Sequence, residues 1–119
     1  MDFDAAMQAH ASWKIKLTGY ATGISHETLD PVATARDNVC ALGQWLHGAG
    51  KATLAGHAEY RDLVAAHAEF HRQAAALVRM IDAGHADQAR AQLENPKSPY
   101  REQSTKVIGL LMKLKAMMK

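Results

Sequence analysis

Apolar residues recur every three or four positions along almost the whole 119-residue chain, and no stretch alternates as a β-strand would. The first of these apolar stripes has a histidine, His10, at its middle, and the longest carries two more, His67 and His71. The pattern predicts helices over roughly 2–22, 31–47, 56–83, 86–93 and 99–119.

Residues typical of helix ends support these ranges. Asp30-Pro31 and Ser98-Pro99 each combine an N-cap residue with proline at the first helical position. Gly48 and Gly50 are expected to close the second helix, and Gly84 the third. Long helices joined by short linkers predict an all-α fold, an antiparallel four-helix bundle with a short extra helix before the last helix, in a single domain over residues 1–119.

Composition narrows the function classes. The net charge of +2, with charges of both signs mixed along the chain, does not favour a nucleic-acid partner. No run of about 18 apolar residues is present and the N-terminus lacks a secretory signal, so no membrane partner is expected. The lysines of the last helix are interpreted as its solvated face. A single cysteine excludes an internal disulfide and fits a reducing compartment. We expect a cytoplasmic bacterial protein.

The histidines at 67 and 71 are the most informative chemical feature. Side chains at i and i+4 lie one above the other on a helix, so both imidazoles can reach one point on its apolar face. Two converging neutral imidazoles indicate a metal ion if other ligands arrive, although a pair of satisfied core histidines stays an alternative. His10 is a candidate third ligand. Cys40 is the only thiol, but it lies off the centre of the second helix's stripe and could instead be a small buried side chain.

Several other metal chemistries fail on spacing. A zincin needs Glu directly after the first His, where this chain has Ala68. Inward carboxylates for a di-iron bundle are missing, as is a Cys-x-x-Cys pair. A haem with two histidine ligands stays open. The four remaining histidines are interpreted as surface residues: His26, His47, His57 and His85.

Three motifs in order resemble the bacterial chemoreceptor zinc-binding domain, CZB. They are His10-Ala-Ser-Trp13-Lys14, Cys40-Ala-Leu42-Gly43-Gln-Trp45-Leu46 and His67-Ala-Glu-Phe70-His71. The resemblance spans roughly residues 7–115. It implies a four-helix bundle in which His10, Cys40, His67 and His71 bind one zinc ion. It also implies control of a signalling output, such as a chemoreceptor or a diguanylate cyclase, and a homodimer.

Zinc chemistry suggests two signals for such a site. Zinc availability would act because occupancy ties the helices together. Oxidation would act because a zinc-bound Cys40 thiolate is nucleophilic, and family members are thought to sense zinc or hypochlorous acid. Asp37, one turn before Cys40, is a candidate to hold a ligand's ring N–H.

Three alternatives remain beside this regulatory sensor. The first is a structural or dimerising bundle with a permanent zinc staple. The second is a metalloenzyme with three histidines and a water on zinc, but four protein ligands leave no open position and no general base is evident, so no enzyme is expected. The third is a plain bundle with core histidines. Whether the chain acts alone or as an excised domain is left open.

Overall fold

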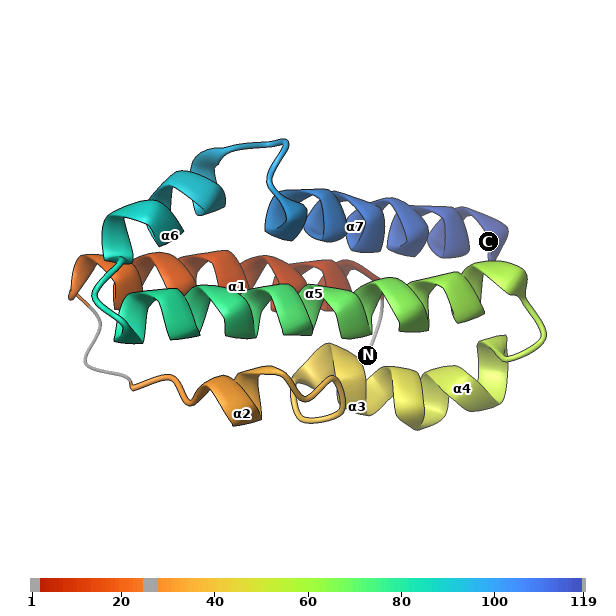
Figure 1. Ribbon diagram of the computed structural model, residues 1–119. Coiled ribbons are helices and arrows are strands. Elements are labelled where there is room, and N and C mark those ends of the chain that lie inside the picture. The colour runs from red at the N-terminus through yellow and green to blue at the C-terminus, as the bar shows by residue number, and fades with distance from the viewer. Residues whose placement is uncertain (1–2, 25–27, 119) are drawn as a thin grey trace.

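The computed structural model describes residues 3–24 and 28–118, and the regular structure in these ranges is entirely helical (Figure 1). The all-α prediction is therefore confirmed. The helices are α1 (Phe3–Thr22), α2 (Pro31–Thr34), α3 (Ala41–His47), α4 (Ala49–Leu54), α5 (Ala58–Asp82), α6 (Ala86–Glu94) and α7 (Pro99–Met117).

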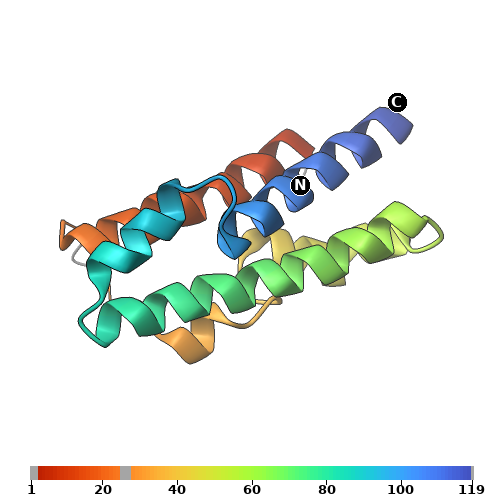
Figure 2. The same ribbon diagram turned by 45° about the horizontal axis from the view of Figure 1, so that its top comes forward.

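The bundle consists of three long helices and a fourth side that is built from three short helices. Helices α1, α5 and α7 lie along one another, and α2, α3 and α4 follow end to end beside α5 (Figure 1). By the colour sequence, α1 and α5 run in one direction, and α2–α4 and α7 run in the other. The short α6 packs against α1 and α5 before the chain turns into α7, as the rotated view also shows (Figure 2).

The predicted helix starts are confirmed by their caps. The Asp30 carboxylate accepts from the Val32 N–H at 3.0 Å, and Pro31 follows as the first helical residue. The Ser98 hydroxyl likewise accepts from the Arg101 N–H at 3.2 Å ahead of α7. The predicted stop after α5 is also present, since Gly84 takes a left-handed φ of +90°.

The prediction of one continuous second helix is wrong. Only Pro31–Thr34 and Ala41–His47 are helical there, and residues 35–40 form an irregular connection. Val32 and Val39, which the apolar stripe of a continuous helix would bury, are 60% and 53% exposed. Gly48 is the C-cap of α3, as expected, but helical structure resumes at once in α4, which contains Gly50. The connection has a physical consequence: it releases backbone carbonyls at the end of α2 for other partners.

The core lies around α5, whose buried face includes both histidines of its i, i+4 pair. Phe70, fully buried, contacts the rings of His10 and Tyr100 with centroids 4.2 and 5.1 Å away. Large fully buried side chains come from every side of the bundle: Leu17, Leu42, Leu46, Leu54, Leu63, Leu77, Leu93, Leu111 and Leu114.

Within residues 3–24 and 28–118, no helix combines the length and apolar character needed to cross a membrane.

Candidate metal centre

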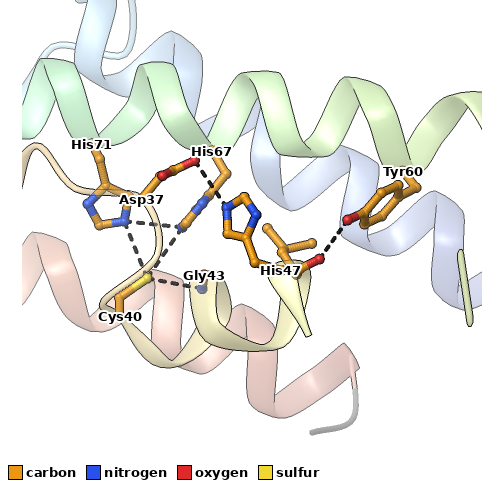
Figure 3. Close-up of polar contacts among 8 residues, drawn as sticks. Asp37, Cys40, Gly43, His47, Tyr60, His67 and His71 are labelled. Carbon is orange, nitrogen blue, oxygen red and sulfur yellow. Dashed lines mark hydrogen bonds and ion pairs between the residues drawn. The ribbon is translucent and has the colours of Figure 1, made fainter. Parts of the chain in front are cut away.

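Cys40, His67 and His71 bring three metal-ligating atoms to one point (Figure 3). The Cys40 Sγ lies 3.4 Å from His67 Nε2 and 3.3 Å from His71 Nε2, and the two nitrogens are 3.1 Å apart. The two histidines are buried in α5 and the cysteine is half-buried at the start of α3. The three atoms thus form a nearly equilateral triangle.

This triangle has the size of one face of a zinc tetrahedron. With Zn–N bonds of about 2.0 Å and a Zn–S bond of about 2.3 Å, two nitrogens lie about 3.3 Å apart and a nitrogen and a sulfur about 3.5 Å apart. The observed separations of 3.1, 3.3 and 3.4 Å are within a few tenths of an ångström of these values. The donor set of one thiol and two imidazoles is also one that zinc prefers. The residues therefore fit the ion.

The tautomer of His71 leaves a lone pair facing the triangle. Its Nδ1–H donates to the Thr34 carbonyl oxygen at 2.9 Å, so the neutral ring has no proton on Nε2. The thiol and the His67 ring can supply at most two protons for three contacts. Hydrogen bonds alone therefore leave one edge of the triangle unsatisfied, whereas a metal ion would accept all three lone pairs.

Burial keeps the histidines neutral. Desolvation, with the neighbouring His71 and His10, lowers the pKa of His67 to about 3, and desolvation also lowers the pKa of His71. Burial raises the pKa of the Cys40 thiol, although N–H groups of Gly43, Leu42 and Trp13 act in the opposite direction. Without metal the site holds neutral imidazoles and a protonated thiol, and metal binding would release the thiol proton.

The irregular connection before α3 positions the sulfur. Cys40 is the N-cap of α3, and its Sγ accepts from the Gly43 N–H at 3.3 Å. Gly43 itself packs directly on that connection, since a Cβ there would meet the Asp37 carbonyl oxygen at 1.8 Å. The sequence placed Cys40 inside a helix and off its stripe. Because Cys40 is an N-cap and not a residue inside the helix, helical periodicity does not decide where its side chain points. The position of Cys40 off the stripe is therefore no objection to its role as a ligand.

His10 does not belong to this three-residue group. Its ring is buried beside Phe70, and its Nε2 lies 2.9 Å from the Ser104 hydroxyl of α7. Its Nδ1 is buried and has no hydrogen-bond partner among the described residues. Desolvation and the nearby His71 lower the pKa of His10 to about 4. The structure thus brings three of the four predicted ligands together and holds the fourth, neutral, toward α7.

Asp37 has a different partner from the one expected. Its Oδ2 lies 3.2 Å from Nε2 of the exposed His47 (Figure 3). The ring N–H of His71 donates to the Thr34 carbonyl instead. A backbone acceptor of this kind has no residue-type signal, so the sequence could not indicate Thr34. His85 is exposed as expected, His57 is half-buried, and His26 lies outside the described residues.

Comparison with known families agrees with this donor set. The family model described as the chemoreceptor zinc-binding domain matches residues 10–78, which include all four predicted ligands. The chain belongs to the chemoreceptor zinc-binding domain family. The resemblance noted in the sequence is therefore confirmed, and the match ends within α5, ahead of α6 and α7. No curated protein and no solved structure matches the chain.

Proposed function

We propose that this CZB domain is a regulatory zinc sensor in which His10, Cys40, His67 and His71 bind one zinc ion. The observation that carries the proposal is the triangle of Sγ and two Nε2 atoms, with edges of 3.1–3.4 Å. His10 is the proposed fourth ligand because it is buried, neutral and packed on Phe70, which also contacts the His71 ring. Four protein ligands would close the site, so we propose no enzymatic activity.

Zinc would act as a link between three parts of the bundle. The proposed ligands come from α1, from the irregular connection before α3, and from α5. Because these parts must be held together for all four donors to reach the ion, binding free energy contributes to bundle stability, on the order of 10 kcal/mol in structural zinc sites. Loss of zinc would free α1 and α3 to move relative to α5, and a partner could respond to that change.

Oxidation of Cys40 would be a second route to the same change. A pocket of about 410 Å³ lies beside α1 and the connection before α3, and its lining includes Cys40, Trp13 and the cationic Lys16 and Arg36. A small oxidant in this pocket would be next to the half-buried sulfur. Conversion of the thiolate to a sulfenic acid weakens its bond to a metal and disturbs the N-cap that the sulfur provides.

The partner in this proposal is a bacterial signalling output, a chemoreceptor or a diguanylate cyclase, in the cytoplasm, with the domain acting as a homodimer. The family's description as a chemoreceptor domain supports the first of these outputs. Cytoplasmic placement is supported by a lone free cysteine, as expected for a reducing compartment.

Reversible zinc exchange tests the sensor against a permanent staple. We expect a competing chelator to remove zinc within the time of an experiment while far-UV circular dichroism stays helical, and added zinc to restore the starting state. His71→Ala should weaken zinc binding strongly, and His47→Ala, which alters an exposed histidine, should not. Zinc that leaves only when the protein unfolds would support the alternative, a permanent structural zinc ion.

The redox part has its own test. Hypochlorous acid should release zinc from the wild-type protein, detected with a chromophoric zinc indicator, and Cys40→Ala should bind zinc more weakly and lose this oxidant-dependent release. An unchanged oxidant response in Cys40→Ala would remove Cys40 as the sensor.

A further inference from the structure

A partly buried polar contact joins α1 to α7 at His10, the proposed fourth ligand. His10 Nε2 and Ser104 Oγ are 2.9 Å apart, and the two helices lie side by side in both ribbon views (Figures 1 and 2). The histidine is 3% exposed and the serine is half-buried, and both line a groove of about 300 Å³ between the helices. A buried ring nitrogen needs such a partner, because an unsatisfied polar atom in a core is costly.

The contacts of the His10 ring distinguish its two nitrogens. Nε2 has the Ser104 hydroxyl oxygen as an acceptor, whereas Nδ1 is buried and has no hydrogen-bond partner among the described residues. A proton on Nδ1 would be a buried N–H without an acceptor, so the proton belongs on Nε2, where the Ser104 oxygen accepts it. The neutral ring is then the Nε2–H tautomer, and Nδ1 carries a lone pair.

We propose that Ser104 is a positioning residue for the metal site: it holds His10 as the Nε2–H tautomer, so that His10 binds zinc through Nδ1 and ties α7 to the site. This inference rests on the proposed zinc function. It mirrors the arrangement at His71, where a carbonyl holds Nδ1–H and leaves Nε2 for the metal. His10 and His71 both contact the Phe70 ring, with centroids 4.2 and 5.4 Å away, so the two histidines lie close to each other in the core.

The link extends the metal site beyond the part of the chain that matches the family. That match ends at residue 78, whereas Ser104 lies in α7. A change in zinc occupancy would alter the His10 ring, its bond to Ser104 and hence the packing of α1 on α7. The last helix is in this way the element through which occupancy is transmitted toward the C-terminus.

Histidine ¹⁵N NMR of the full chain tests the proposal. In the metal-free protein His10 should be the Nε2–H tautomer, and with ¹¹³Cd bound its Nδ1 resonance should be split by cadmium while His67 and His71 show the splitting at Nε2. Ser104→Ala should shift the His10 tautomer equilibrium and weaken zinc binding roughly tenfold. Ser104→Thr, which keeps a hydroxyl, should retain both the tautomer and the zinc affinity of the wild-type protein. Thr105→Ala alters an exposed neighbour that lines the same groove and should also leave the tautomer and the zinc affinity unchanged.

A double-mutant cycle separates this role from packing. If Ser104 acts through His10, Ser104→Ala should have no further effect on zinc affinity in a His10→Ala background. Cadmium bound to His67 and His71 with His10 bound through Nε2, or not at all, would overturn the inference and leave a zinc site in place. Absence of metal binding in the wild-type protein would overturn the proposed function together with the inference.

Discussion

Gly43→Ala tests whether the connection before α3 sets the position of the sulfur. Gly43 lies in the first turn of α3, and its N–H donates to Cys40 Sγ. A Cβ at this position would meet the carbonyl oxygen of Asp37 at 1.8 Å and the carbonyl carbon at 2.8 Å. Both are backbone atoms, so no side chain can rotate away, and α3 and the connection would have to separate by more than about 1 Å.

The expected cost follows from two opposing effects. Alanine is favoured over glycine in a helix by about 1 kcal/mol. Overpacking costs about 1–3 kcal/mol, and a clash between backbone segments belongs at the upper end of that range. We therefore expect Gly43→Ala to lower the free energy of unfolding by about 2 kcal/mol. Because the separation displaces Cys40, zinc affinity should fall on the order of tenfold.

The matched control is Gly109→Ala in α7. This exposed glycine has open space where a Cβ would lie, so the substitution should raise the free energy of unfolding by up to about 1 kcal/mol and leave zinc affinity unchanged. Urea unfolding of the metal-free proteins, followed by tryptophan fluorescence, gives the first quantity, and competition with a zinc chelator gives the second. Equal results for the two variants would refute the proposed role of Gly43.

Three further predictions concern the surroundings of the site. Burial lowers the pKa of His10 to about 4 and that of His67 to about 3, from the ordinary value of 6.5. Between pH values of about 6.5 and about 4, the unfolded chain therefore binds more protons than the folded protein does. The metal-free protein should lose on the order of 3 kcal/mol per histidine over this window, and a urea midpoint independent of pH would contradict the burial of neutral rings. Tyr60→Phe removes a hydrogen bond of 2.6 Å to the Leu46 carbonyl and should cost about 1 kcal/mol of unfolding free energy by the same assay; no change would mean that this contact does not help hold α3 on α5. Asp37→Ala removes only the contact with the exposed His47 side chain and should leave zinc affinity within about twofold in chelator competition, whereas a tenfold loss would show that Asp37 supports the metal site.

The three long helices could be predicted from the sequence because their apolar period is continuous and their ends carry strong signals. Ser98 begins α7 and Gly84 follows the end of α5, as expected, and Asp30 also caps the short α2. The histidine pair of α5 could be predicted as well, since i, i+4 spacing on a buried face is a local property.

The break between α2 and α3 could not be predicted, because residues 35–40 contain neither proline nor glycine. The interruption depends on tertiary contacts: the Thr34 carbonyl accepts from His71 of α5, and Gly43 packs on Asp37. The contact between His10 and Ser104 could not be predicted either, since it joins residues 94 positions apart in the sequence. The local sequence pattern specifies the helices. Contacts between residues that are far apart in the sequence place the donor atoms of the metal site.

Metal analysis combined with zinc X-ray absorption tests the central claim most directly. Protein purified without added metal should contain close to one zinc per chain, with a first coordination sphere of one sulfur and three nitrogens. A sphere without sulfur, or a protein that retains no stoichiometric metal of any kind, would contradict the account.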